Sequence, residues 1–307
     1  MTLVTSDACA VVLTYQPDMA SLDALVERIV PQVAGTVIVD NGSGAEARAA
    51  LAKVVARFPS VRAIYLDANL GVAAGQNRGI QAALEQGCAF VLILDQDSLP
   101  APGMVAELAE GFRRAAGAAS KVAAVGPRYS QQLTGETFRF MRLGTLGLKY
   151  LPCTDGELVR ADFLISSGCL FSAAAIRDIG LMREELFIDH VDTDWFMRAR
   201  LGGWAAYGAC SATMEHRLGD RTLRFWLGGW RVIALHSPLR HYYQFRNRVH
   251  LFLRSRYPLR WKAAEATRSL GMFVVIGLLL PDRAAHVKMM LRGIRDGLRG
   301  RLGRYEE

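Results

Sequence analysis

Residues 90–98 read FVLILDQDS, in which an apolar strand, Phe90 to Leu94, is followed at once by Asp95 and Asp97. Asp is a poor strand former, so two of them at the end of a strand call for a reason. Ligands of open α/β sheets bind just outside the carboxyl ends of the strands. Two carboxylates one residue apart suit Mg²⁺ or Mn²⁺, which prefer oxygen ligands and bind phosphate oxygens at the same time. A solvated turn is the alternative, and the surrounding sequence has to decide.

Strand and helix signals alternate through the first 115 residues. Apolar runs predict strands, and a helical spacing of apolar residues predicts the segments between them. Such alternation predicts parallel βαβ units with right-handed crossovers, and therefore an α/β fold with a doubly wound, mostly parallel sheet. The predicted strands are 8–14, 37–39, 61–66 and 90–94, and the predicted helices are 18–30, 45–57, 75–86 and 103–115.

The second half of the chain departs from this rhythm. Residues 128–160 predict a hairpin insertion, and residues 162–171 a strand interrupted by Ser166-Ser167-Gly168. A helix with acidic residues at its start is predicted over 190–201. Beyond residue 216 the pattern predicts helices only, at 238–256, 261–280 and 283–302.

Composition is that of a globular protein, but the charge is uneven. The 307 residues are 51% hydrophobic and carry a net charge of +8, with a balance of −5 in residues 1–216 and +13 in residues 217–307. No apolar run reaches the ~20 residues that span a bilayer, and no basic segment precedes the first apolar stretch, so we expect no signal peptide. Five scattered cysteines predict reduced, buried thiols and a cytoplasmic protein.

Four successive strand ends carry polar side chains. In a parallel sheet these ends open onto the same edge, and their convergence distinguishes the chain from one with a stray pair of acids. We expect a pocket lined by Asp40, by the amides of Asn69 and Asn77, and by the acidic pair. Such a pocket suits a base, a ribose and a diphosphate in turn. The strand ends are 14–17, 40–43, 67–71 and 95–97.

The order and spacing of these motifs resemble glycosyltransferase family 2, the inverting GT-A fold, and within it bacterial rhamnosyltransferases. The resemblance runs from about residue 9 to the C-terminus. It implies a GT-A domain over 1–225, with a nucleotide-sugar half to about 127 and an acceptor half from about 128, followed by a helical, basic, membrane-associating region over 226–307. The motifs are VVLTYQP, VDNGS, DANLGVAAGQNRGI, LDQDS, SSG, FIDHVDTDWFMR, EHRLGD and YYQFRNR.

For the donor, the resemblance implies that Asp40 pairs with the nucleotide base. Asp95 and Asp97 would bind Mg²⁺ or Mn²⁺, with His216 helping to hold the metal or the diphosphate. The remainder of the nucleotide-sugar pocket would be lined by Thr14, Tyr15, Asn69, Gly71, Asn77 and Gln96.

For the acceptor, the family's Glu-Asp motif has Val191 at the Glu position and Asp192 at the Asp position. Asp192 is therefore the predicted general base, and Asp194 is the fallback. Gly168, Trp195 and Arg198 are the predicted acceptor contacts.

Several of these residues have a plain structural alternative. His216 could be a structural histidine, and Trp195 a buried helix aromatic. The turn at 166–168 could be a strand bulge, and Arg198 a surface arginine.

Two other classes of protein are alternatives. Gly42-Ser43-Gly44-Ala45-Glu46-Ala47 imitates the glycine-rich turn of an NAD(P)-dependent oxidoreductase, and Asp67 follows 20 residues beyond Ala47. However, Asp40 directly before the turn would repel a pyrophosphate, and such an enzyme would leave Asp95 and Asp97 without a role. The other class is a basic binding module, for which nucleic acid is not expected because no known binding fold accompanies the charge.

The basic C-terminal region predicts contact with a membrane surface. Apolar and basic residues alternate at helical spacing over 283–304, as in helices that lie in a bilayer interface, and the aromatic run at 240–248 adds rings that favour it. A packing helix or a contact in a homo-oligomer is the alternative. The residues themselves predict an enzyme that uses a nucleotide-diphosphate sugar, and the basic tail places it at the inner face of the plasma membrane. The resemblance to rhamnosyltransferases implies transfer of L-rhamnose from dTDP-rhamnose to a lipid-linked or lipopolysaccharide oligosaccharide. The alternatives are another nucleotide sugar or the oxidoreductase.

Overall fold

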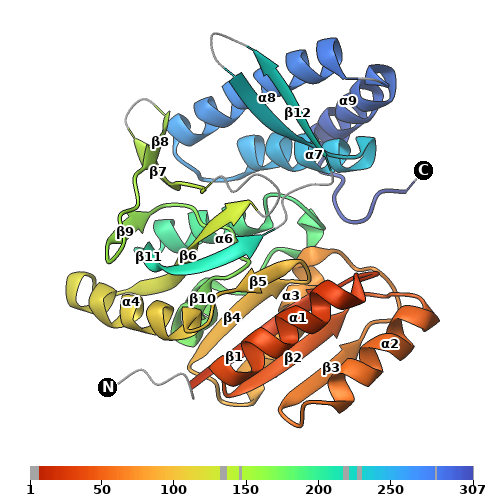
Figure 1. Ribbon diagram of the computed structural model, residues 1–307. Helices are drawn as coiled ribbons and strands as arrows, with labels where there is room; N and C mark the ends of the chain where they lie inside the picture. The colour runs from red at the N-terminus through yellow and green to blue at the C-terminus, as the bar shows by residue number, and fades with distance from the viewer. Residues whose placement is uncertain are drawn as a thin grey trace.

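The computed structural model describes residues 7–131, 137–144, 147–216, 221–226, 230–280 and 282–306 (Figure 1). Its first half alternates strands and helices as predicted. The short strand β5, directly after the acidic pair, was not predicted. The elements are β1 (Ala8–Thr14), α1 (Met19–Ile29), β2 (Gly35–Asp40), α2 (Ala45–Ala56), β3 (Val61–Tyr65), α3 (Val72–Glu85), β4 (Phe90–Asp95), β5 (Ser98–Pro100) and α4 (Met104–Ala118).

Strands β3, β2, β1 and β4 lie side by side in that order and are all parallel. Their register aligns the strand ends, because Thr14 faces Asp40 on one side while its neighbour Leu13 faces Asp95 on the other. Asp40 in turn faces Tyr65 at the end of β3. The predicted convergence of the four strand ends at one edge of the sheet is therefore confirmed.

The second half completes the sheet with antiparallel and parallel strands in the order β4-β10-β6-β11-β5. The predicted hairpin is present as β7 and β8. The continuous strand predicted over 162–171 is wrong, because only β10 at its end forms a strand and Phe163 makes an isolated bridge to Met141. The turn at 166–168 interrupts the chain before that point. The elements are β6 (Val122–Gln131), β7 (Phe140–Gly144), β8 (Gly147–Leu151), β9 (Leu158–Ala161), β10 (Leu170–Ser172), α5 (Ala173–Ile179), α6 (Val191–Leu201) and β11 (Ala205–His216).

The sheet is covered on both faces, as a parallel sheet requires. Alternate residues of β1 point to opposite cores: Val11 packs with α3, α5 and α6, whereas Val12 packs with α1, α2 and α4. This two-sided burial fixes the sheet as a rigid platform whose carboxyl edge carries the polar loops.

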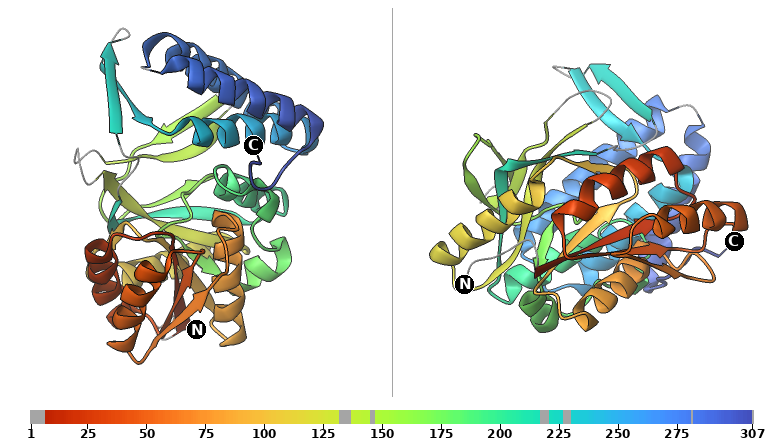
Figure 2. Two further views of the ribbon diagram at one scale, coloured as in Figure 1. Left: turned by 90° about the vertical axis from the view of Figure 1, so that its right-hand side faces the viewer. Right: turned by 60° about the horizontal axis from the view of Figure 1, so that its bottom comes forward.

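The C-terminal region consists of a hairpin, β12 (Arg221–Trp226) and β13 (Trp230–Leu235), and three helices, α7 (Pro238–Arg254), α8 (Leu259–Leu279) and α9 (Arg283–Arg299). The helices lie together at one end of the molecule (Figures 1 and 2). The predicted helices are confirmed, but the prediction of helices only is wrong because it missed the hairpin, and the expected boundary at residue 225 falls inside β12. Within the described residues, no helix has both the length and the hydrophobicity needed to cross a bilayer.

Helix α9 uses its apolar face to pack on α7. Met290 is fully buried, and Gly293 and Gly297 let the two backbones meet, since a Cβ on either would come within 2.6 Å of an α7 carbonyl oxygen. The apolar face of α9 that the sequence assigned to a membrane is therefore covered in part, since Leu291 and Leu298 remain 52% and 55% exposed. The aromatic run at 240–248 is likewise buried: Tyr242, Tyr243 and Phe245 are each less than 5% exposed.

Four of the five cysteines are paired. Disulfides join Cys9 to Cys88 and Cys153 to Cys210, while Cys169 is free and buried. The prediction of five reduced thiols is therefore wrong, and with it goes the cysteine argument for a cytoplasmic location. Cys9 lies on β1 and Cys88 just before β4, so neighbouring strands bring together residues 79 positions apart.

Candidate active site

The end of β2 builds the first part of the site. Asp40 is buried, and its carboxylate accepts hydrogen bonds from Arg48 Nε and the Ser43 backbone N–H, both at 3.1 Å. Asn41, next along the chain, donates to Asn69 Oδ1 at 3.2 Å and accepts from the Leu70 N–H at 3.0 Å. Asp40 and Asn69, both predicted nucleotide contacts, are thus brought to the same edge.

The ends of β1 and β4 are joined by one side chain. Gln96 Oε1 accepts a 2.7 Å hydrogen bond from the Tyr15 backbone N–H, while the Tyr15 side chain is 46% exposed. Thr14 is fully buried, and its hydroxyl donates to the Val39 carbonyl at 3.3 Å. Thr14 therefore ties strands together, whereas Tyr15 presents its ring at the surface of the site.

The turn at 166–168 contacts the acidic pair directly. Ser167 Oγ accepts from the Asp95 N–H at 2.9 Å and lies 2.8 Å from Ser98 Oγ, so it spans the loop that carries Asp95 and Asp97. Gly168 has a φ of +81°, and a Cβ there would come within 2.9 Å of Pro127 and Met214. The glycine is thus required by the turn itself, which is how its backbone N–H reaches the Ile93 carbonyl at 2.7 Å.

Asp192, in the first turn of α6, faces the same turn. Burial raises the pKa of its carboxyl to about 6; the negative charges of Asp189 and Asp95 add to this, while backbone N–H groups of Thr193 and Ser166 oppose it. The predicted base and the acidic pair therefore share one electrostatic environment, with Ser166 and Ser167 between them. A carboxylate with a pKa near 6 is suited to general base catalysis near neutral pH.

Asp194, the fallback base, has a different setting. It is fully buried, accepts from Arg198 Nε at 2.8 Å, lies 3.5 Å from Arg183 Nη2, and accepts a hydrogen bond from the Tyr257 hydroxyl. The remaining donors of Arg198 go to backbone carbonyls at 179 and 181. Asp194 and Arg198 thus anchor α6 to its surroundings.

Trp195 is a core residue. It is 1% exposed, its Nε1 donates to the Gly180 carbonyl at 2.9 Å, and its ring packs edge-on against Phe171 and Phe196. The structure therefore places Trp195 away from any surface on which an acceptor could stack, in agreement with the alternative of a buried helix aromatic.

The residues at the end of β4 fit a divalent cation. Asp95 and Asp97 supply two hard oxygen donors at the strand edge, and a diphosphate would supply others. Among the residues that the structure describes, no three His, Cys, Asp or Glu side chains form a cluster that could hold a metal by themselves. His216 ends β11, where its backbone pairs with Ser98, but its side chain lies outside the described part of the chain.

The family model of glycosyl transferase family 2 matches residues 9–179, more than half of the chain. The matched span contains both the acidic pair and the turn at 166–168. The chain belongs to glycosyl transferase family 2. The family decides against the oxidoreductase alternative, and the structural neighbours below confirm the GT-A-like fold.

A curated relative extends the similarity over the whole chain. The dTDP-rhamnosyl transferase RfbF of Shigella flexneri is 29% identical over 302 residues, which cover 98% of each protein. The glycosyltransferase activity predicted from the sequence is thereby confirmed, and this relative points to a rhamnosyltransferase.

Solved structures share the fold at low sequence identity. GalNAc-T7 with UDP, GalNAc and Mn²⁺ superposes with a TM-score of 0.62 at 13% identity, and PcManGT, a mannosyltransferase from Pyrobaculum calidifontis, in complex with GDP-Man and Mn²⁺ with a TM-score of 0.55 at 11% identity. TarS of S. aureus follows at 0.52 and 15%. Each comparison covers 95% of this chain, which spans 56%, 87% and 48% of the respective neighbours.

Two predicted donor contacts hold the glycosyltransferase site together rather than opening into it. Asn77 is buried; its amide donates to the Met182 carbonyl and to Glu184 Oε1, both at 2.9 Å, and its Oδ1 accepts from the Met182 N–H. Gly71 has a φ of +91°, and a Cβ there would lie 2.6 Å from Phe187. Both residues therefore fix the segment that leads into α6.

That segment is also held by α7, which sequence reasoning assigned to a membrane. Arg246 and Asn247 are fully buried and donate to backbone carbonyls of residues 185–189, and Arg248 Nε donates to His190 Nε2 at 3.1 Å. The signal was present as the motif YYQFRNR, but residues so polar and so completely buried could not be recognised without the fold.

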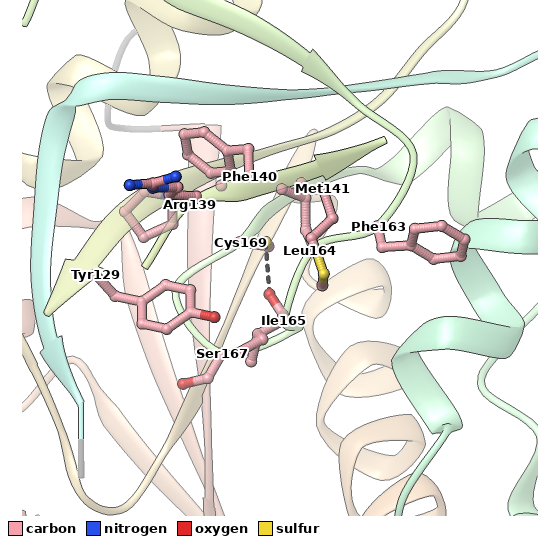
Figure 3. A pocket seen from close by; sticks show the side chains of 11 residues that line it. Tyr129, Arg139, Phe140, Met141, Phe163, Leu164, Ile165, Ser167 and Cys169 are labelled. Atoms are coloured by element: carbon pink, nitrogen blue, oxygen red, sulfur yellow. Dashed lines mark hydrogen bonds between the residues drawn. The ribbon is translucent and has the colours of Figure 1, made fainter. Parts of the chain in front are cut away.

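One cavity lies beside the turn at 166–168, and a second lies at the end of α6. The first, beside Ser167 and Cys169, has room for about one water (about 20 Å³) and is lined by Tyr129, Phe140 and Phe163 among others (Figure 3). Burial raises the pKa of Tyr129, which lines this cavity, and the negative charge of Asp192 adds to the rise. The second, of about 240 Å³, lies at the far end of α6, where Arg200 and Trp204 line it.

Proposed function

We propose that the chain is an inverting, metal-dependent rhamnosyltransferase that uses dTDP-L-rhamnose as its donor. The observation that carries the proposal is the placement of Asp95, the turn at 166–168 and Asp192 at one sheet edge in a family 2 glycosyltransferase. The donor sugar is supported by the similarity, across the whole chain, to a dTDP-rhamnosyl transferase. The Mn²⁺ in two structural neighbours supports a divalent metal.

The nucleotide would lie along the ends of β2 and β3. Asp40, held by Arg48 and by the Ser43 N–H, would accept a hydrogen bond from the ring imide N–H of the nucleotide base. Asn69 and the turn that Asn41 builds would follow, with Tyr15 and Gln96 at the ends of β1 and β4. Asp95 and Asp97 would hold a divalent cation, which neutralises charge on the departing diphosphate when it is bound.

Asp192 would supply the base. Its carboxylate takes the proton of an acceptor hydroxyl while that oxygen bonds to the anomeric carbon and the bond from this carbon to the diphosphate breaks. Because attack comes from the face opposite the leaving group, the anomeric configuration inverts. Asp194 is already bonded to Arg198 and Tyr257, so we assign it a structural role.

A donor screen tests this proposal. We expect release of dTDP from dTDP-rhamnose in the presence of Mg²⁺ or Mn²⁺, and much slower turnover of UDP-glucose, UDP-galactose and GDP-mannose. Faster turnover of one of the other three donors would overturn the assignment of rhamnose but leave the assignment as a glycosyltransferase unchanged.

We further propose that the acceptor is a lipid-linked or lipopolysaccharide oligosaccharide, reached from an anionic membrane surface. Helix α8 exposes a stripe at a spacing of four residues, with Leu270, Val274 and Leu278 exposed by 66%, 47% and 69%. Helix α9 packs on α8 and adds exposed Lys288 and Arg295. An exposed apolar stripe beside basic groups suits the interface of an anionic bilayer.

Vesicle sedimentation tests the membrane proposal. The chain should bind phosphatidylglycerol vesicles and not phosphatidylcholine vesicles, and the variant Leu270→Ser/Leu278→Ser should lose binding while still turning over donor. The matched control Leu239→Ser, at an exposed leucine of α7, should bind like the parent. Undiminished binding by the α8 variant would overturn the proposal, and a change from dimer to monomer would identify the stripe as a homo-oligomer contact.

A further inference from the structure

The four residues before α6 have an unusual backbone. Five non-glycine residues of the described chain have a positive φ, and three of them are Phe187, Asp189 and His190, at 65°, 64° and 61°. Phe187 also has a ψ of −65°, and the Ile188 N–H bonds to the Leu186 carbonyl at 2.8 Å, which together form a strained γ-turn. Each such conformation costs of order 1–3 kcal/mol, so the surrounding structure must hold this loop in place.

The side chain of Asn247 provides the hold. Its Nδ2 lies 3.0 Å from the Leu186 carbonyl oxygen and 2.9 Å from those of Ile188 and Asp189. Arg246 Nε donates to Asn247 Oδ1 at 3.0 Å, which orients the amide so that its N–H groups face the loop. One fully buried side chain thus contacts two carbonyls of the four-residue loop and the carbonyl of Leu186 directly before it.

Other α7 residues fasten the same loop. Arg246 Nη2 donates to the Leu186 carbonyl at 2.9 Å, and Arg240 pairs with the Asp189 carboxylate at 3.2 Å. His190, kept neutral because burial holds its pKa well below the usual value, accepts from Arg248. These contacts are charge-assisted, and those of Arg246 and Arg248 are also buried and therefore costly to break. Together they anchor the loop to α7.

The loop touches both halves of the candidate active site. On the donor side, the Phe187 carbonyl accepts a 2.6 Å hydrogen bond from the Val72 N–H, next to the Gly71 turn. On the acceptor side, His190 is the N-cap of α6, and its carbonyl accepts the first helical bond from the Asp194 N–H at 2.9 Å. Asp192 lies within that first turn, so its position follows from the loop's.

We propose that Asn247 is a positioning residue that sets Asp192 against the donor by holding the strained loop 187–190. This inference rests on the proposed function, in which Asp192 is the base. Helix α7 thereby belongs to the catalytic apparatus, although it lies outside the family-matched residues 9–179. Misplacing a catalytic group by about 1 Å costs on the order of 10²-fold in rate.

The test compares Asn247→Asp with a matched control. Asp has the shape of Asn but presents oxygen to three carbonyl oxygens, so it removes the hold without leaving a cavity. We expect kcat for dTDP-rhamnose turnover to fall about 10²-fold, with the Kd for dTDP changed less than about threefold. The control is Gln244→Ala, one turn earlier on α7, whose buried Oε1 has no hydrogen-bond partner among the described residues; its kcat should stay within about twofold.

A second variant and a double mutant make the outcome decisive. Asn247→Ser keeps one hydrogen-bond donor, so its kcat should lie between those of the parent and of Asn247→Asp. If Asn247→Asp fails to fold, the kcat of Asn247→Ser can still be measured. In an Asp192→Asn background, Asn247→Asp should change the residual rate less than about twofold, because both act through one group. Additive losses, or parental kcat in Asn247→Asp, would overturn the inference, whereas full turnover by Asp192→Asn alone would overturn the proposed base instead.

Discussion

The replacement Asp192→Asn tests the proposed chemistry most specifically. Asn keeps the size of the side chain and can still accept from the Thr193 N–H, but it cannot take a proton. General base catalysis contributes on the order of 10²–10⁴-fold, so kcat should fall by that factor. The Kd for dTDP should change little, because the nucleotide is assigned to the ends of β2 and β3.

The pH dependence of the parent supplies an independent measure of the same group. Burial together with Asp189 and Asp95 raises the Asp192 pKa to about 6, so the base is ionised above that pH and protonated below it. Release of dTDP, followed from pH 4.5 to 8.5, should therefore fall about tenfold per unit below pH 6. Asp192→Asn should lose this acidic limb. Retention of both the limb and the rate in the variant would refute the assignment and return the role to Asp194.

Three further substitutions test the supports of the site. Gly168→Ala should lower the free energy of unfolding by about 2 kcal/mol or more in denaturant titrations, because it puts a side chain on a left-handed backbone and adds a close contact. The control Gly117→Ala, in α4 with open space around it, should leave the free energy of unfolding unchanged or raise it. Asp194→Asn should lower it by about 3 kcal/mol, because it breaks a buried ion pair; unchanged stability with lost activity would make Asp194 catalytic. Arg48→Gln should weaken dTDP binding roughly tenfold in calorimetry, because Asp40 loses the side chain that holds it. An affinity equal to that of the parent would show that Asp40 does not bind the nucleotide base.

The parallel half of the fold was predictable because local signals and topology agree there. Each strand from β1 to β4 is an apolar run that ends in polar residues, and right-handed crossovers leave one arrangement in which these ends meet. Asp40, Asn69 and Asp95 could therefore be expected at one sheet edge from the strand ends, whereas Asp192 was predicted from the family resemblance alone.

The remainder depends on contacts between distant segments, which periodicity does not report. Trp195 and Asp194 have the residue types of a binding site, and only packing against Phe171 and Tyr257 reveals them as supports. The motif around Asn247 looks like an aromatic, basic surface until α9 covers it. The cysteine pairs were hidden for the same reason, since strand neighbours rather than spacing bring them together.

Binding of dTDP-rhamnose, measured by calorimetry with Mn²⁺ present and then with EDTA in excess, tests the central claim most directly. We predict binding by the parent that weakens at least tenfold in EDTA, and weak binding under both conditions for Asp95→Ala/Asp97→Ala. Equal affinity in all four measurements would contradict the claim that the carboxylates closing β4 organise the donor site.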